Sequence, residues 1–233
     1  MPAPPLILLP GLLCDAALWR APLRHLLPRV PCLVPSLTEH DTIHHLARHV
    51  LSLAPPQFQM AGLSMGGYVA MDVMRQAPQR VTKLALLNTS ARPDTDDQLE
   101  RRSGLISLSQ QGKFKGVTPR LLPLLISPAH QNNRLVTRPI MEMAERTGQA
   151  AFERQQKAIM SRIDSRPHLP HITIPTLVIG GADDALTPAP ITQEIANLIP
   201  ESRFELLHNC GHLSPLEQPE KVSELMTEWF FAD

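Results

Sequence analysis

The sequence predicts an α/β protein, in which a parallel sheet carries helices on both faces. Short apolar runs alternate with amphipathic stretches over the first 90 residues, and the alternation resumes near the C-terminus. The 24 prolines and 11 glycines among 233 residues keep the elements short, and hydrophobic residues make up 43% of the chain but aromatic residues only 4%. Alternating strands and helices around an aliphatic core are typical of a doubly wound sheet with right-handed crossovers.

The first half of the chain contains four apolar runs with the length and pattern of strands, separated by helical stretches. The strands are expected at residues 6–9, 32–35, 58–63 and 81–87, and the helices at 18–27, 41–54 and 64–77. Asp41 or Thr42 is the candidate N-cap of the middle helix, since either side chain can accept a hydrogen bond from the first turn. Pro55-Pro56 and Pro78 are expected to end the last two helices.

Residues 92–166 differ from the rest of the chain, because glycines and prolines separate helical segments there and no strand pattern appears. Strands are expected again at 176–179 and 203–207, and helices at 188–198 and 216–231. We therefore expect about six mostly parallel strands in a core of residues 1–91 and 167–233, with residues 92–166 inserted as a small helical cap. The cap holds 13 Lys or Arg against 8 Asp or Glu and is more basic than the core.

Charge balance and cysteine spacing argue against several classes of protein. Lys plus Arg and Asp plus Glu both total 22, so the chain lacks the basic excess of a nucleic-acid-binding domain. Its three cysteines have no CxxC spacing, which argues against a disulfide framework or a zinc ribbon. The apolar N-terminus lacks preceding Lys or Arg and is broken by Pro10-Gly11, far short of a membrane span. We expect a cytoplasmic protein that binds neither nucleic acid nor membrane.

The segment from Gly62 to Gly67 reads Gly-Leu-Ser-Met-Gly-Gly and has the form GxSxG between an expected strand and an expected helix. In a nucleophile elbow this strained turn projects the serine hydroxyl above the sheet, and glycines are needed where side chains would collide with neighbouring backbone. Ser64 is therefore the candidate nucleophile. The alternative is that Ser64 only caps the helix that begins at Met65.

A nucleophilic serine needs a base, and the base needs an acid to orient it. The strand ending at Ile179 is followed by a loop with Asp183 and Asp184, and the last strand is followed by a loop with His208 and His212. The order Ser64, Asp184, His212 matches the order of serine, acid and histidine in an α/β-hydrolase.

These motifs resemble those of the α/β-hydrolase superfamily, specifically its small bacterial serine esterase-like members. The resemblance covers nearly the whole chain: LLPG, GLSMGG, GADDALTP and CGHLSPLEQPE occur in the expected order. It implies that the acid precedes the loop proline by four residues, which selects Asp184 over Asp183, and that Gly211-His212 carries the catalytic histidine rather than His208. Some relatives carry the acid after the preceding strand, where this chain has Asn88. Asp94 is therefore only a distant fallback.

The oxyanion hole of this fold is built from two backbone N–H groups, one following the nucleophile and one in the loop after an early strand. In this chain these are the N–H groups of Met65 and Leu12. Relatives commonly have His-Gly in the early loop, whereas this chain has Pro10-Gly11. The departure affects the loop's supporting hydrogen bonds rather than the donor itself.

The resemblance implies a serine hydrolase that cleaves a carboxylic ester or thioester of small or medium acyl length without a metal or organic cofactor. Cofactor-free lyases, lactonases and carbon–carbon bond hydrolases share the same three residues and remain alternatives. A catalytically inactive fold used for binding is a remote alternative, since such proteins usually lack one of the three. A homodimer is left open.

Within the cap, the candidates for lining an acyl pocket are apolar, although ordinary helix packing also explains them: Leu121, Leu125, Met141 and Met160. The arginines of the cap are compatible with steering an anionic substrate, and equally with a solvated helical surface.

Overall fold

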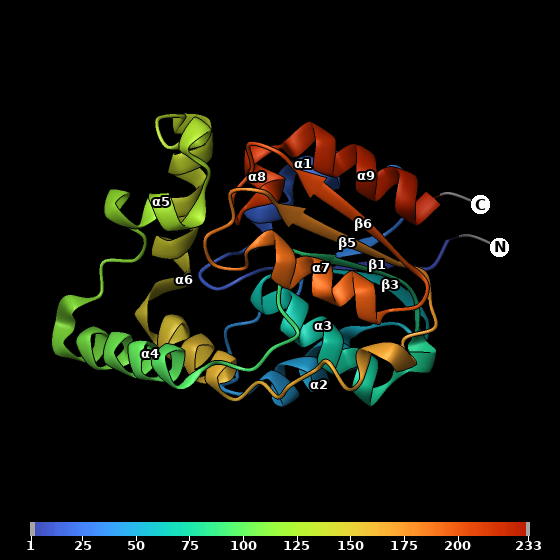
Figure 1. The fold of residues 1–233 in the computed structure, drawn as a ribbon, viewed down its shortest axis with the longest axis horizontal. Helices are drawn as coiled ribbons and strands as arrows, with labels where there is room; N and C mark the ends of the chain where they lie inside the picture. The colour runs from blue at the N-terminus through green and yellow to red at the C-terminus, as the bar shows by residue number, and fades with distance from the viewer. Residues whose placement is uncertain (1–2, 232–233) are drawn as a thin grey trace.

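The computed structural model describes residues 3–231 and contains one six-stranded sheet (Figure 1). The strands are β1 (Leu6–Leu9), β2 (Cys32–Leu33), β3 (Phe58–Leu63), β4 (Val81–Leu87), β5 (Thr176–Gly181) and β6 (Ser202–Leu207). They lie in the order β2-β1-β3-β4-β5-β6, and every strand pair in the described residues is parallel. The predicted sheet of about six mostly parallel strands is confirmed.

Helices cover both faces of the sheet, which explains why strands β1, β3 and β5 are buried along their whole length and mostly apolar. One face packs against α2 (Ile43–Leu53), α3 (Met65–Gln76) and α7 (Ala189–Leu198). The other packs against α1 (Arg20–Leu26), α8 (Ser214–Glu217) and α9 (Pro219–Phe231). The short helical turns of the core are η1 (Ala16–Trp19), η2 (Pro78–Arg80) and η6 (Leu169–His171).

Several predicted bounds shift by one or two residues, the helix expected at 18–27 is divided into η1 and α1, and two further elements differ from the prediction. The last helix, expected at 216–231, is divided into α8 and α9, because a proline at position 219 lacks the N–H that would continue the first helix. The second strand pairs over two residues instead of four, as an edge strand next to β1. Of the two N-cap candidates for α2, Thr42 is the cap: its Oγ1 accepts from the His45 N–H at 3.2 Å. The outermost residues of the predicted core, 1–2 and 232–233, lie outside the described residues.

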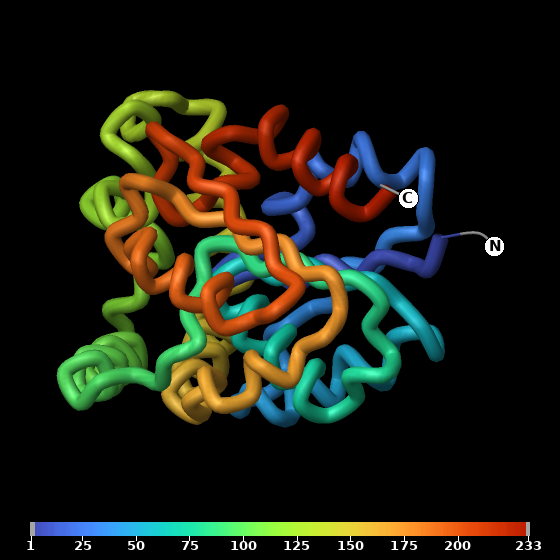
Figure 2. Tube along the Cα trace, turned by 45° about the vertical axis from the view of Figure 1, so that its right-hand side comes forward, coloured from blue at the N-terminus to red at the C-terminus, as the bar shows by residue number. Residues whose placement is uncertain are grey.

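Residues 92–166, called the insertion below, are all described and contain helices but no strand. They form α4 (Asp96–Leu108), α5 (Leu122–Leu125) and α6 (Arg134–Met160), with shorter turns η3 (Ser109–Lys113), η4 (Pro119–Leu121) and η5 (Pro128–His130). The insertion lies beside the carboxyl ends of the strands in both views (Figures 1 and 2). Gly148, with φ 75° and ψ 174°, interrupts α6, so this long helix consists of two pieces.

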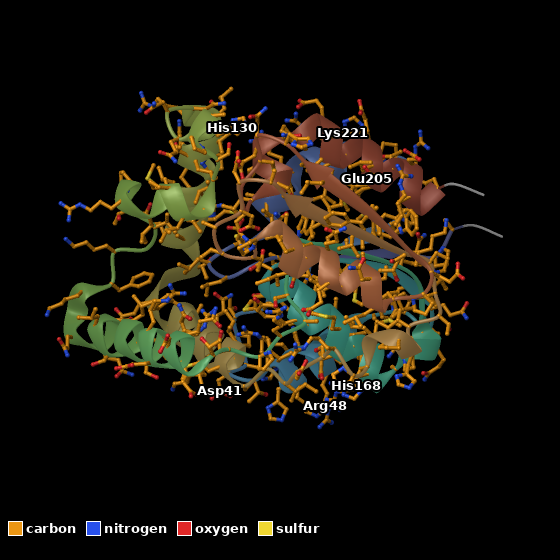
Figure 3. All side chains as sticks on the ribbon, in the orientation of Figure 1. Asp41, Arg48, His130, His168, Glu205 and Lys221 are labelled. Atoms are coloured by element: carbon orange, nitrogen blue, oxygen red, sulfur yellow. The ribbon has the colours of Figure 1, made fainter. Side chains whose placement is uncertain are left out.

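The outer face of α2 is solvated: Arg48 is exposed and points away from the sheet (Figure 3). Within residues 3–231, no helix is both long enough and apolar enough to cross a bilayer.

Candidate active site

Ser64 occupies a strained turn between β3 and α3. Its φ of 53° and ψ of −115° lie outside the regions that a non-glycine residue ordinarily adopts, as expected of a nucleophile elbow. The turn is fixed on both sides, because the Ser64 N–H donates to the Leu87 carbonyl at 3.0 Å and the Thr89 hydroxyl donates to the Ser64 carbonyl at 2.8 Å. The end of β4 and the residues that follow it therefore hold the serine in this conformation.

Glycine is required on both sides of Ser64 for steric reasons. A Cβ at Gly62 would overlap the backbone of Gly66, and a Cβ at Gly66 would overlap the carbonyl of Leu9 at the end of β1. The close approach brings the N-terminus of α3 against the loop that follows β1. The GxSxG pattern is thus explained by backbone contact rather than by flexibility.

The hydroxyl of Ser64 faces His212, with 2.8 Å between Ser64 Oγ and His212 Nε2. Ser64 occupies the N-cap position of α3, but its hydroxyl makes no hydrogen bond to the first turn, so the alternative that the side chain only caps the helix is wrong. His212 is buried, 4% exposed, and its Nδ1 lies 2.8 Å from Asp184 Oδ2 and 3.0 Å from Oδ1. Because a carboxylate only accepts, Nδ1 carries the proton and Nε2 is free to accept from the serine.

Asp184 is held by donors on each of its oxygens. Oδ1 accepts from the N–H groups of Leu186 and Thr187, both at 2.9 Å. Oδ2 accepts from the Thr187 hydroxyl at 2.8 Å and from Asn88 Nδ2 at 3.1 Å. Burial raises the pKa of Asp184, but the charge and hydrogen bond of His212, with the bonds from Thr187 and Asn88, outweigh burial and lower the pKa to about 2. Asp184 is therefore a carboxylate at neutral pH.

The other acids considered from the sequence lie elsewhere. Asp183 is exposed, and its backbone N–H donates to the Cys210 carbonyl at 2.9 Å. Asp94 is buried between Arg102 and Arg162, with N–O distances of 2.8 and 2.7 Å. The structure therefore brings Ser64 and His212 together with Asp184 and with neither of the other two acids.

Asn88 is a neighbour of the site that the sequence did not reveal as a contributor. It follows β4 with a φ of 45° and is fully buried. Its amide Nδ2 donates to Asp184 and, at 3.0 Å, to the Gly211 carbonyl, while its Oδ1 accepts from the Ser214 hydroxyl at 2.6 Å. One side chain thus connects the acid loop with the loop that carries His212.

The histidine loop is also held by a buried carboxylate, Glu217 of α8. Glu217 accepts from the N–H groups of Gly211 and Leu213, which flank His212, and from the N–H of Ser127 in the insertion at 2.7 Å. Burial raises the pKa of Glu217, and the three backbone bonds oppose this rise only in part. The backbone N–H of His212 donates to the Leu125 carbonyl at 3.0 Å, so the insertion contacts the histidine loop directly.

The loop after β1 carries the predicted oxyanion donor Leu12. Gly11 packs next to Ser64, because a Cβ at Gly11 would be 3.5 Å from the Ser64 Cβ. The Cys14 N–H donates to the Gly11 carbonyl at 3.1 Å and closes a turn in which Leu13 has a φ of 58°. The second predicted donor, Met65 N–H, is at the first residue of α3, where N–H groups have no partner within the helix.

Of the predicted pocket residues, Leu121 is 41% exposed, whereas Leu125 packs against the core cluster that also contains Cys210 and Leu213. Met141 and Met160 are half-buried. An apolar group that the sequence did not single out lies against the oxyanion loop instead: Leu12 and Leu13 from the core, with Phe114, Val117, Ala144 and Phe152 from the insertion.

The two cysteines near the site are poor nucleophiles in this setting. Burial, followed by the charge of Asp15, raises the pKa of Cys14 to about 12, and burial raises the pKa of Cys210 as well. Among the described residues, no group of three or more His, Cys, Asp or Glu side chains is placed to bind a metal ion.

A Ser–His–Asp arrangement at the carboxyl ends of a parallel sheet, with the serine on a strand–turn–helix elbow, defines the α/β-hydrolase class. The chain belongs to this family: the model of the alpha/beta hydrolase family matches residues 6–225. The predicted fold class, the superfamily resemblance and the expectation of an enzyme of this class are confirmed.

Similar proteins include esterases and a lactonase. The pimeloyl-[acyl-carrier protein] methyl ester esterase of Vibrio vulnificus is 23% identical over 93% of this chain and 90% of its own. A thermophilic esterase from Thermogutta terrifontis is 29% identical with a TM-score of 0.87, covering 97% of this chain and 88% of that one. The enol-lactonase from Burkholderia xenovorans LB400 superimposes with a TM-score of 0.89 over 99% of this chain and 92% of that one at 23% identity.

Proposed function

We propose that the protein is a serine hydrolase that cleaves a carboxylic ester or thioester through an acyl-enzyme. The observation that carries the proposal is the continuous hydrogen-bonded series from Ser64 Oγ through His212 to Asp184, with distances of 2.8 Å on both sides of the imidazole. An enzyme with this series can remove the serine proton at the moment when the oxygen attacks a carbonyl.

In the first half-reaction, Ser64 Oγ forms a bond to the carbonyl carbon and its proton moves to His212 Nε2. Asp184 keeps the imidazole in the required tautomer and stabilises the imidazolium. The N–H groups of Met65 and Leu12 would stabilise the negative oxygen of the tetrahedral intermediate. The alcohol or thiol then leaves with the proton from Nε2, and water repeats the sequence on the acyl-enzyme.

The acyl group is inferred to be small or medium in size. The support is the apolar group from the insertion that packs against Leu12 and Leu13, since it limits the room over the oxyanion loop. We treat residues 92–166 as the cap that encloses this acyl group. Steering of an anionic substrate has less support, because six of the ten arginines of residues 92–166 pair with carboxylates of this chain: Arg92, Arg102, Arg138, Arg146, Arg162 and Arg166.

The test is turnover of a panel of p-nitrophenyl esters of increasing chain length, together with thioesters, lactones and vinylogous diketones. Ester turnover that disappears in Ser64→Ala and survives in Ser223→Ala, a buried serine of α9, is the expected result. Preference for lactones or diketones would favour the alternative reactions of the same three residues. Folded protein that turns over no ester would overturn the esterase proposal.

A further inference from the structure

The oxyanion loop is bound by a glutamine of the insertion. Leu13 N–H donates to Gln155 Oε1 at 3.0 Å, and Gln155 Nε2 donates to the Leu37 carbonyl at 3.1 Å. Because one partner is an N–H and the other a carbonyl, the orientation of the amide is fixed by its contacts. Gln155 is 1% exposed, so these bonds are shielded from bulk solvent. A single side chain of α6 thereby joins the insertion to two loops of the core.

The bond from Leu13 acts on a strained turn. The turn is closed by Cys14 N–H to Gly11 O, and Leu13, at its third position, has a φ of 58°, as a type II turn requires. That position favours glycine, because a leucine Cβ collides with its own backbone there. Without a partner for the Leu13 N–H, rotation of the Leu12–Leu13 peptide would relieve the strain and move the loop. Gln155 opposes that rotation from outside the turn.

Leu12 contributes the carbonyl of this peptide, and its own N–H is the predicted donor to the oxyanion. We propose that Gln155 is a positioning residue of the reaction: through Leu13 it holds the turn in the strained form that aims the Leu12 N–H at the developing oxyanion. The inference rests on the proposed function. The amide of Gln155 bonds to Leu13 and Leu37 instead of to Ser64, so we assign it an action through the loop.

The neighbouring glutamine provides a matched control. Gln156 is on the same helix and is similarly buried, 2% exposed, but its Oε1 accepts from Arg102 Nη1 at 2.8 Å instead of from the oxyanion loop. Gln155→Leu and Gln156→Leu remove the same amide from the same helix. Loss of activity through general weakening of the insertion would affect both variants, whereas loss of the loop contact affects only the first.

The experiment compares ester hydrolysis by the two variants and the wild type. For Gln155→Leu we expect kcat to fall about 10- to 100-fold with KM within about twofold, since the oxyanion contact forms only in the transition state. Inhibition constants should separate in the same way: a trifluoromethyl ketone, which forms a charged tetrahedral adduct on the serine, should weaken by the same factor, while the matching methyl ketone should not. Gln156→Leu should retain wild-type kcat.

A second variant tests the strain directly. With glycine at position 13 the left-handed φ costs little, so the turn no longer depends on the glutamine. In the Leu13→Gly background, Gln155→Leu should therefore lower kcat by less than about threefold. If Gln155→Leu does not fold, Gln155→Asn, whose shorter side chain cannot span both partners, is measured in its place.

Two failures are distinguishable. Wild-type protein that neither hydrolyses esters nor binds the trifluoromethyl ketone would overturn the proposed function and this inference with it. An active wild type with a folded Gln155→Leu variant of unchanged kcat, or an equal loss in Gln156→Leu, would overturn the role of Gln155 alone.

Discussion

Replacing Asp184 by asparagine isolates the orienting role of the acid, because the change removes a charge and keeps the shape. In the wild type, Oδ1 accepts from two backbone N–H groups, so the amide oxygen of the new side chain should take that position. The amide NH₂ then takes the place of Oδ2, where it faces Asn88 Nδ2 at about the 3.1 Å of the present bond and donates to His212 Nδ1. The imidazole proton must then move to Nε2.

That tautomer prevents the reaction as proposed. With the proton on Nε2, 2.8 Å from Ser64 Oγ, the imidazole donates to the serine and cannot take its proton. The same substitution in a serine protease triad lowers kcat by about 10⁴, so we expect a loss of that order, equivalent to about 5 kcal/mol in activation free energy. The opposed amide groups of positions 88 and 184 should also cost about 1–3 kcal/mol of stability.

The assay is hydrolysis of p-nitrophenyl butyrate at saturating substrate near pH 8, with thermal unfolding measured to establish that each variant folds. Asp183→Asn is the matched control, because Asp183 is the adjacent acid and is exposed. We expect it to keep kcat within about twofold. An Asp184→Asn variant that folds and keeps kcat within tenfold of the wild type would refute the tautomer argument.

Three further predictions concern stability. The folded pKa of Asp184, about 2, is below the roughly 3.9 of an unfolded chain, so its stabilisation is complete only above about pH 5 and is lost as the pH falls towards 2. The unfolding free energy of the wild type relative to Asp184→Asn should therefore drop by about 2 kcal/mol between pH 5 and pH 2, and a constant difference in urea titrations would disagree. Gly66→Ala should lower the free energy of unfolding by about 1–3 kcal/mol or more, because its methyl group would overlap the Leu9 carbonyl. Gly104→Ala, which has open space around it inside α4, should instead raise the free energy of unfolding by about 0.5–1 kcal/mol. Equal melting temperatures of the two variants would contradict the steric argument. Glu217→Gln places an NH₂ group among three backbone donors and should lower the free energy of unfolding by about 1–3 kcal/mol. An unchanged denaturant midpoint would show that the bonds to Glu217 contribute little to stability.

The sheet was predictable because its signals are local. Apolar runs bounded by proline and glycine mark β1, β3 and β4 directly, and the strand bounds at 6–9, 58–63 and 81–87 agree with the structure. Ser64 was predictable for the same reason, since GxSxG describes the steric needs of one turn. The division of the last helix was missed although Pro219 was visible, because the apolar spacing continues on both sides of it.

The supporting contacts of the site were not predictable, because they join residues far apart in the chain. Asn88 and Asp184 are 96 positions apart, and Leu13 and Gln155 are 142 apart. Asparagine and glutamine at these positions carry no motif, and a buried amide becomes meaningful only when its partners are known. The choice of Asp184 over Asp183 needed the family pattern, since both residues occupy the same loop.

The most direct test of the account is labelling of the folded protein with a fluorophosphonate, followed by intact mass measurement and peptide mapping. A single adduct on Ser64, absent in Ser64→Ala and formed far more slowly in Asp184→Asn, is the result the account predicts. Folded wild-type protein that takes up no label, or takes it up at another residue, would contradict the assignment of Ser64 as the nucleophile.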